Sequence, residues 1–168
     1  RGGTGYAKAA GNYAASLLPT KYAQEQGYNQ ILWTDGLTHE YFEESGTMNV
    51  IFRSGNTIFT PMVSDSILDG VTRDSVLTLA RDWGYTVEER QVSVKEVVDL
   101  LKEGKLDAAF GTGTAATIAP IRTIHHEGTD YTLQPLSNWE FVNRCVEELE
   151  RIHLGIGDDK HNWSVRVV

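Results

Sequence analysis

The sequence predicts a mixed α/β fold, either α/β or α+β, in which a mainly β core is covered by outer helices. The chain has 168 residues, of which 40% are hydrophobic and 23% charged, a composition typical of a globular domain. Segments with helical spacing of apolar residues alternate with β-like segments along the chain. No internal repeat or low-complexity segment interrupts this order, so we expect residues 1–168 to form a single domain.

The predicted helices are marked mainly by their ends. Gly27 and Gly84 can end the first two, and Ser93 with Glu96 forms a capping box for the third. Pro19 falls inside the first helix, so we expect a bend or a restart there. In chain order, the predicted elements are a helix within residues 11–30, β segments at 30–35, 41–46 and 48–61, a helix within 64–84, a strand at 85–92, a helix at 93–105, a β-rich stretch at 106–124 and a helix at 139–155.

The strand assignments rest on apolar runs separated by turn residues. The pair Ser54-Gly55 divides two such runs and predicts a hairpin. The strands up to the end of this hairpin follow one another closely, so they can pair as an antiparallel meander. The apolar stretch at 106–124 also reads as β structure, punctuated by Gly111 and Gly113.

Charge and cysteine content narrow the classes of function. The net charge is −8 and the 15 Lys and Arg residues are scattered, so we expect no nucleic-acid surface. No apolar run is long enough to span a membrane. Cys145 is the single cysteine and falls on the apolar face of the last helix, which favours a core position and a cytoplasmic protein without an internal disulfide. The pair His125-His126 lies in a polar stretch and predicts a solvated turn rather than a metal site.

The opening stretch, RGGTGYAKAAGNY, places Lys8 among glycines and alanines. Such small residues allow another group to approach the backbone closely. A buried lysine loses its proton readily, and its neutral amine can then form a Schiff base with an aldehyde. A flexible glycine-rich tail with a solvated lysine is the alternative interpretation.

Two carboxylates, Glu43 and Glu44, precede a turn that leads into an apolar strand. Adjacent residues of a strand face opposite sides, so one of the two can point inward. An inward carboxylate needs a cationic partner, and a protonated ring nitrogen would serve. The alternative is a solvated acidic edge of a hairpin.

Two further segments could bind an anion. Gly70 stands where the helix within 64–84 begins, and the backbone N–H groups at a helix start form an anion site. The stretch GTGTAA at 111–116 combines glycines, which expose backbone amides, with threonine hydroxyls. The alternatives are an ordinary helix cap with Arg73 in solvent and a β-bulge in a core strand.

Five stretches together resemble the branched-chain amino acid aminotransferases, the fold type IV enzymes that use pyridoxal 5′-phosphate (PLP). These stretches are GGTGYAKAAGNYAASLL, EESGTMNVIF, ILDGVTRDSVL, FGTGTAATIAPI and the closing HNW. The likeness covers nearly the whole chain, and its motifs are specific in this order. It implies that residues 1–168 are the large C-terminal, cofactor-bearing domain of that fold, and that the family's N-terminal domain is absent from this chain.

The resemblance implies a role for each of four residues around the cofactor ring. Lys8 corresponds to the catalytic lysine that forms the Schiff base with PLP and then shuttles a proton. Tyr13 corresponds to the tyrosine near the phenolic oxygen of the cofactor, and Glu44 to the carboxylate that pairs with the pyridine nitrogen. Thr47 corresponds to a residue that lines the cofactor and the substrate side.

The resemblance also implies how the two anionic groups are bound. Val71 and Thr72 correspond to the helix-start amides that hold the PLP phosphate, and Thr114 to the hydroxyl that joins them. Ala115 and Ala116 correspond to the turn whose amides meet the substrate carboxylate.

The activity implied by the resemblance is transamination between leucine, isoleucine or valine and 2-oxoglutarate, in an enzyme that works as a homodimer. D-amino acid transaminase and aminodeoxychorismate lyase share the fold and stay open as alternatives, as does a non-catalytic fragment or binding module. In the family, the N-terminal domain supplies an arginine for the phosphate and part of the side-chain pocket. We therefore expect the 168-residue chain alone to bind PLP weakly and to show little activity.

Overall fold

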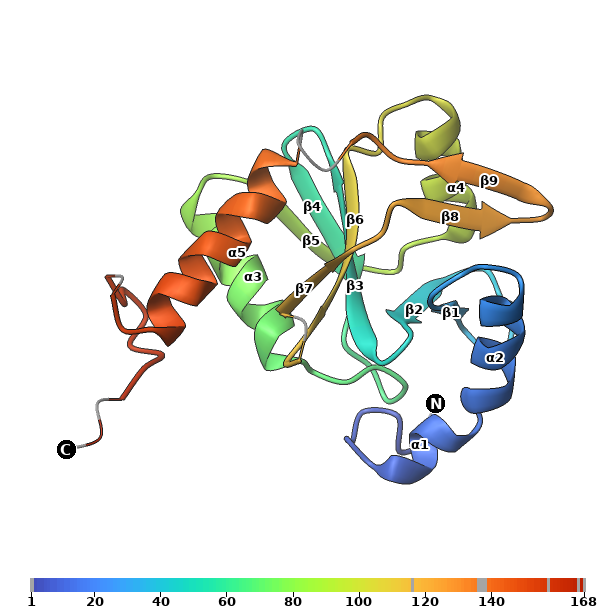
Figure 1. Ribbon diagram of the computed structural model, residues 1–168, viewed down its shortest axis with the longest axis horizontal. Coiled ribbons are helices and arrows are strands. Elements are labelled where there is room, and N and C mark those ends of the chain that lie inside the picture. Colours follow the sequence, from blue (N-terminus) through green and yellow to red (C-terminus); the bar gives the residue numbers. More distant parts are fainter. Residues whose placement is uncertain (1, 116, 136–138, 157, 166, 168) are drawn as a thin grey trace.

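The computed structural model describes residues 2–115, 117–135, 139–156, 158–165 and 167. Within them, a seven-stranded mixed sheet and a separate two-stranded sheet are flanked by helices, which confirms the predicted β core with outer helices (Figure 1). In order, the elements are α1 (Ala10–Ala14), α2 (Leu17–Glu25), β1 (Leu32–Thr34), β2 (Phe42–Ser45), β3 (Met48–Ser54), β4 (Thr57–Pro61), α3 (Val71–Asp82), β5 (Thr86–Arg90), α4 (Val94–Lys102), β6 (Ala108–Gly113), β7 (Thr117–Pro120), β8 (Thr123–His126), β9 (Thr129–Thr132) and α5 (Glu140–His153).

The large sheet is an antiparallel meander with one parallel addition. Strands β1 to β4 pair antiparallel in chain order, as predicted, and β6 pairs antiparallel with most of β3. Strand β5 instead pairs in parallel with β4, because α3 carries the chain back from the end of β4 to the start of β5. This crossover brings the start of α3 to the end of the sheet where β4 finishes.

The hairpin between β3 and β4 turns at Gly55-Asn56, one residue later than predicted. Ser54 still pairs with Thr57, so it belongs to the ladder rather than to the turn. Gly55 has a φ of 56°, in the left-handed region that glycine adopts without strain. The hairpin itself is confirmed.

Two glycines of β6 leave room for a methionine on the neighbouring strand β3. A Cβ atom at Gly111 would lie 2.9 Å from Met48 Cε, and one at Gly113 would lie 3.1 Å from Met48 Cγ. The register of β6 against β3 and β7 runs without a shift, so this strand has no bulge among its described residues. The glycines therefore serve close packing.

The first predicted helix is two helices, and the interruption precedes Pro19. Helix α1 ends at Ala14, and α2 begins at Leu17. Pro19 falls in the first turn of α2, where its missing N–H would have no helical partner in any case. Gly27 follows α2 with a φ of 92° and confirms the predicted stop. Neither helix contains a buried residue, so the apolar side chains of this segment lie outside the core.

Helices α3 and α5 pack side by side on the sheet. Phe141 of α5 meets Trp83 at the end of α3 edge-on, with ring centroids 5.9 Å apart, and approaches Phe110 of β6 at 6.3 Å. Cys145 of α5 is buried in the same core, as predicted. The predicted start of α4 is also confirmed, because Ser93 Oγ accepts a hydrogen bond from Glu96 N at 3.0 Å.

His125 and His126 end β8 rather than lie in a turn, and Glu127 and Gly128 make the turn that follows. The His125 imidazole approaches Asp130 within 2.6 Å. Among the described residues, no group of histidine, cysteine, aspartate and glutamate side chains suits a metal ion. No described helix combines the length and the apolar character needed to cross a membrane.

Candidate active site

A cavity of about 640 Å³ opens where the N-terminal segment meets β2, the ends of β3 and β6, and the start of α3. Several residues that the sequence assigned to a cofactor or substrate line this cavity together. They are Lys8, Tyr13, Glu44, Thr47, Val71, Thr72 and Thr114. Ala115 is exposed and does not line it, and Ala116 lies outside the described residues.

Lys8 lies in an irregular segment before α1 and is exposed, which agrees with the alternative of a solvated lysine and not with a buried one. Its small neighbours leave it uncovered by the rest of the described chain. The segment is nevertheless tied to the loop before α3, because Tyr6 N donates to Asp65 O at 3.0 Å. Gly5 packs directly on this loop, and a Cβ there would lie 2.6 Å from Ser66 Cα. This is the close backbone approach that the glycine-rich opening suggested.

Both adjacent carboxylates line the cavity, so strand alternation alone did not separate them. The Glu43 side chain borders the cavity and reaches the loop before α3, where its Oε1 accepts a hydrogen bond from Ser66 Oγ at 2.5 Å. Glu44 Oε1 accepts from Leu68 N at 3.1 Å. Burial raises the pKa of the Glu44 carboxyl, the Leu68 hydrogen bond opposes this, and the charge of Glu43 adds to the rise in pKa. The Leu68 hydrogen bond thus holds the Glu44 carboxylate in place, and a nearby cation would stabilise its charged form.

The start of α3 presents backbone donors to the cavity that have no partner among the described residues. Its N-cap is Gly70, which has no side chain to bond the first-turn amides, so the N–H groups of Val71 and Thr72 are available. A Cβ at Gly70 would overlap Asn49 Oδ1 from β3. The close approach of Asn49 thus requires glycine at the N-cap, and the arrangement leaves an anion site at the helix end.

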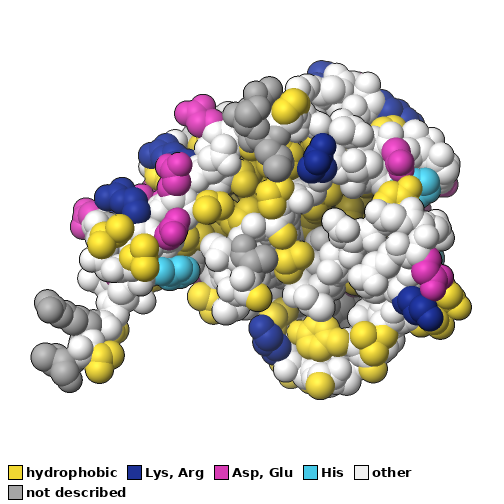
Figure 2. Space-filling model, viewed as in Figure 1, with side chains coloured by type: hydrophobic (Ala, Val, Ile, Leu, Met, Phe, Trp, Pro, Cys, Tyr) yellow, Lys and Arg dark blue, Asp and Glu magenta, His cyan; other side chains and the backbone are white. Residues whose placement is uncertain are grey.

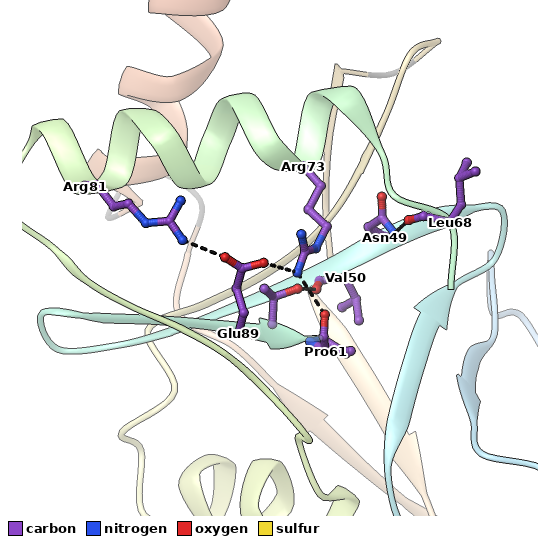
Figure 3. A network of polar contacts seen from close by, with 8 residues as sticks. Asn49, Val50, Pro61, Leu68, Arg73, Arg81 and Glu89 are labelled. Atoms are coloured by element: carbon purple, nitrogen blue, oxygen red, sulfur yellow. Dashed lines mark hydrogen bonds and ion pairs between the residues drawn. The ribbon is translucent and has the colours of Figure 1, made fainter. Parts of the chain in front are cut away.

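Arg73 anchors this first turn of α3 to the sheet (Figure 3). It is 2% exposed, which contradicts the interpretation of an arginine in solvent. Its Nη2 donates to Pro61 O at 3.0 Å and to Glu89 Oε2 at 2.9 Å, and therefore connects the helix to both strands of the parallel pair. Arg81, further along α3, donates to the other oxygen of Glu89 at 2.6 Å. Burial works against the charge of Glu89, but the two arginines lower its pKa.

Thr112 belongs to the GTGTAA stretch whose threonine hydroxyls predicted an anion site, although the sequence analysis assigned it no role of its own. It lines the cavity from β6, two positions before Thr114, and is only 2% exposed. Alternation on a strand places residues i and i+2 on the same face, so the assignment of Thr114 was a signal that pointed to Thr112 as well.

Comparison with known proteins identifies the family of this chain. Residues 4–124 match the family described as amino-transferase class IV. The chain belongs to the class IV aminotransferases. It is 42% identical over 167 residues to a probable branched-chain-amino-acid aminotransferase of Staphylococcus epidermidis, a match that covers 99% of this chain and 47% of that relative.

Solved class IV structures show the same arrangement of elements. The branched-chain amino acid aminotransferase from Escherichia coli superposes with a TM-score of 0.74 at 29% identity and covers 95% of this chain and 50% of that one. The enzyme from Thermobaculum terrenum, solved in its PLP form, gives a TM-score of 0.74 at 28% identity over 95% of this chain and 48% of that one. This class IV chain thus spans about half the length of the relatives it matches.

Proposed function

We propose that this chain is the cofactor-bearing part of a PLP-dependent branched-chain aminotransferase, which exchanges amino groups between leucine, isoleucine or valine and 2-oxoglutarate. The observation that carries the proposal is the single cavity that brings together Lys8, Glu44 and the start of α3. The names of the relatives support the choice of substrates.

The residues present fit PLP group by group. PLP carries a phosphate, a pyridine nitrogen and an aldehyde. The amides of Val71 and Thr72 and the hydroxyl of Thr114 suit the phosphate, the Glu44 carboxylate suits a protonated ring nitrogen, and the Lys8 amine suits the aldehyde. The N-cap Gly70 leaves the helix start uncapped, as an anion site requires.

Bound PLP would supply an electron sink for the charge that develops when substrate Cα loses its proton. Lys8 Nζ would hold the cofactor covalently and, once released, would take up and return the Cα proton. Glu44, oriented through its Oε1 by the Leu68 amide, would keep a proton on the ring nitrogen. The raised pKa of Glu44 means that a cation opposite it would stabilise its charged form.

The remaining assigned residues would orient the cofactor and the substrate. Tyr13 would lie near the phenolic oxygen of PLP, and Thr47 would line the side where substrate enters, since both border the cavity. We keep Ala115 and Ala116 as the turn whose amides meet the substrate carboxylate, because they directly follow Thr114 in the chain.

The proposal extends to parts that this chain does not contain. We propose an N-terminal domain, a homodimer and a cytoplasmic location. Figure 2 shows hydrophobic surface at the bottom of the view, where Figure 1 places α1. Exposed hydrophobic side chains on the N-terminal segment support a covering partner. They include Tyr6, Leu17, Leu18 and Tyr22. The single buried cysteine suits a reducing compartment.

The direct test is an amino-donor panel assayed with 2-oxoglutarate and PLP, on this chain and on any longer polypeptide that contains it. We expect leucine, isoleucine and valine to be preferred over D-alanine, with low rates for the 168-residue chain itself. The Lys8→Ala variant should lose turnover by about 10⁴-fold or more, since it removes both the attachment point and the general base. Lys21→Ala is the matched control, because Lys21 lies on α2 and does not line the cavity. A preference for D-alanine, or PLP binding without turnover in the longer polypeptide, would contradict the proposed function.

A further inference from the structure

Two buried threonines on the strands beside β3 differ in one respect. Thr60 of β4 is fully buried, and its Oγ1 donates to Val50 O at 2.6 Å. Thr112 of β6 is 2% exposed, and its Oγ1 has no hydrogen-bond partner within the described part of the chain. Buried hydroxyls in native proteins are nearly always paired, so the Thr112 hydroxyl calls for a partner beyond the described part of the chain.

The Thr112 side chain faces the start of α3. Thr112 pairs directly with Asn49 across the β3–β6 ladder, and residues paired in this way project from the same face of a sheet. The Asn49 side chain reaches the loop before α3, where its Nδ2 donates to Leu68 O at 2.7 Å (Figure 3). Its Oδ1 lies against Gly70. Since Thr112 also lines the cavity, its hydroxyl belongs to the cavity wall beside the uncapped helix end.

The chemistry around this hydroxyl selects an anionic oxygen as its partner. The same cavity is lined by donors with free hydrogen-bonding capacity: the amides of Val71 and Thr72 at the helix start and, two positions along β6, the hydroxyl of Thr114. Several donors that converge on one point bind an oxygen of a phosphate better than a neutral group. A hydroxyl can supply one more donor to such an oxygen.

We propose that the Thr112 hydroxyl donates a hydrogen bond to a phosphate group held at the start of α3, as the innermost contact of that site. This inference depends on the proposed function only in naming PLP as the ligand that carries the phosphate. The free protein then keeps a buried hydroxyl unpaired, at a cost in stability, and the bound phosphate satisfies it.

This account predicts effects of opposite sign for two chemically identical substitutions. Thr112→Val removes an unpaired hydroxyl, so the ligand-free chain should melt at the same temperature or about 2–4 °C higher. Thr60→Val removes a paired hydroxyl and leaves Val50 O without its donor, so that variant should melt lower. Thr112→Ser keeps the hydroxyl and should keep the ligand affinity.

The binding experiment compares pyridoxamine 5′-phosphate, pyridoxamine and inorganic phosphate, none of which can form a Schiff base with a lysine. Calorimetric titrations of the chain should show that Thr112→Val weakens both phosphate-containing ligands by about tenfold or more and leaves pyridoxamine unchanged. Thr60→Val should leave the affinities for all three ligands unchanged.

The outcomes separate this inference from the proposed function. If the wild-type chain binds inorganic phosphate but not pyridoxamine 5′-phosphate, the proposed function fails, and the phosphate titration of Thr112→Val alone decides the inference. Unchanged phosphate affinity in Thr112→Val, or a fall in its melting temperature like that of Thr60→Val, overturns the inference. A wild-type chain that binds neither phosphate ligand overturns both.

Discussion

The two sides of the cavity are held in very different ways. The sheet side is part of the core: β3 and β6 contribute fully buried residues, and the buried Arg73 in the first turn of α3 bonds the helix to the parallel strands. The N-terminal side, with α1 and α2, buries no helical residue and is attached to the loop before α3 by a few backbone contacts. The anion site and Glu44 are therefore preorganised by the core. Lys8, in contrast, lies on a segment that the other described residues leave largely exposed.

A large effect on stability should come from the anchor of the sheet side. Arg73→Met removes a buried cation that bonds Pro61 O and Glu89, and we expect a loss of about 3 kcal/mol in the free energy of unfolding. Arg81→Met is the matched control, because Arg81 bonds the same glutamate with a side chain that is 48% exposed, and we expect a loss of at most about 1 kcal/mol. Urea unfolding measures both. Similar losses would show that Arg73 does not anchor α3.

The next effect concerns catalysis, where substitutions of Glu44 and Glu43 should change turnover to different extents. Glu44→Gln should lower turnover by about 100-fold, as expected for the loss of one preorganised electrostatic contact, whereas Glu43→Gln should be mild. Steady-state assays of both variants in the longest active polypeptide check this order. Equal effects would contradict the assignment of Glu44 to the ring nitrogen.

The same glutamate predicts a pH dependence of stability in the ligand-free chain. Its folded-state pKa is raised by burial, so its contribution to stability is fully present below the unfolded pKa and is lost as the pH rises through the folded pKa. Glutamine does not ionise, so the Glu44→Gln variant does not lose this stability as the pH rises. It should therefore be more stable than wild type at neutral pH, and the difference should shrink on acidification. Thermal melts between pH 4 and 7 measure it, and a constant difference would contradict the burial of this carboxyl.

The smallest effect should come from the N-terminal side. Leu17 of α2 is 70% exposed, so Leu17→Ala should change the free energy of unfolding of this chain by less than about 0.5 kcal/mol. Leu77 of α3 is 1% exposed, and Leu77→Ala should cost about 2–5 kcal/mol. A large loss for Leu17→Ala in the monomeric chain would mean that α2 is packed, and the contrast between the two sides would disappear.

Local patterns predicted most elements, because caps, turns and apolar spacing act over a few residues. Ser93 and Gly27 marked real helix ends, and the hairpin before Thr57 was displaced by a single residue. The parallel pairing of β4 with β5 was not predicted, since it depends on where α3 packs rather than on either strand. The sequence left open whether Lys8 is buried or solvated, because small neighbours look the same in a tight pocket and in an open segment.

The candidate site was predictable as separate motifs but not as one cavity. Val71 and Thr114 came from motifs, whereas only the folded structure shows that they share a wall with Glu44. Thr112 received no individual role because a threonine in an apolar strand carries the same sequence signal as Thr60, whose hydroxyl is paired inside the core. The difference between the two lies in their neighbours across the sheet, which the sequence alone does not display.

The central claim is that the loosely held Lys8 and the core-held anion site form one PLP site. Its most direct measurement is borohydride reduction of the chain with less than one equivalent of PLP, followed by peptide mass mapping, with and without excess inorganic phosphate. The account predicts a pyridoxyl group on Lys8 that diminishes when phosphate competes, because the phosphate site directs the aldehyde to this lysine. Labelling of Lys21 or Lys105 to the same extent as Lys8, or labelling of Lys8 that phosphate does not reduce, would contradict it.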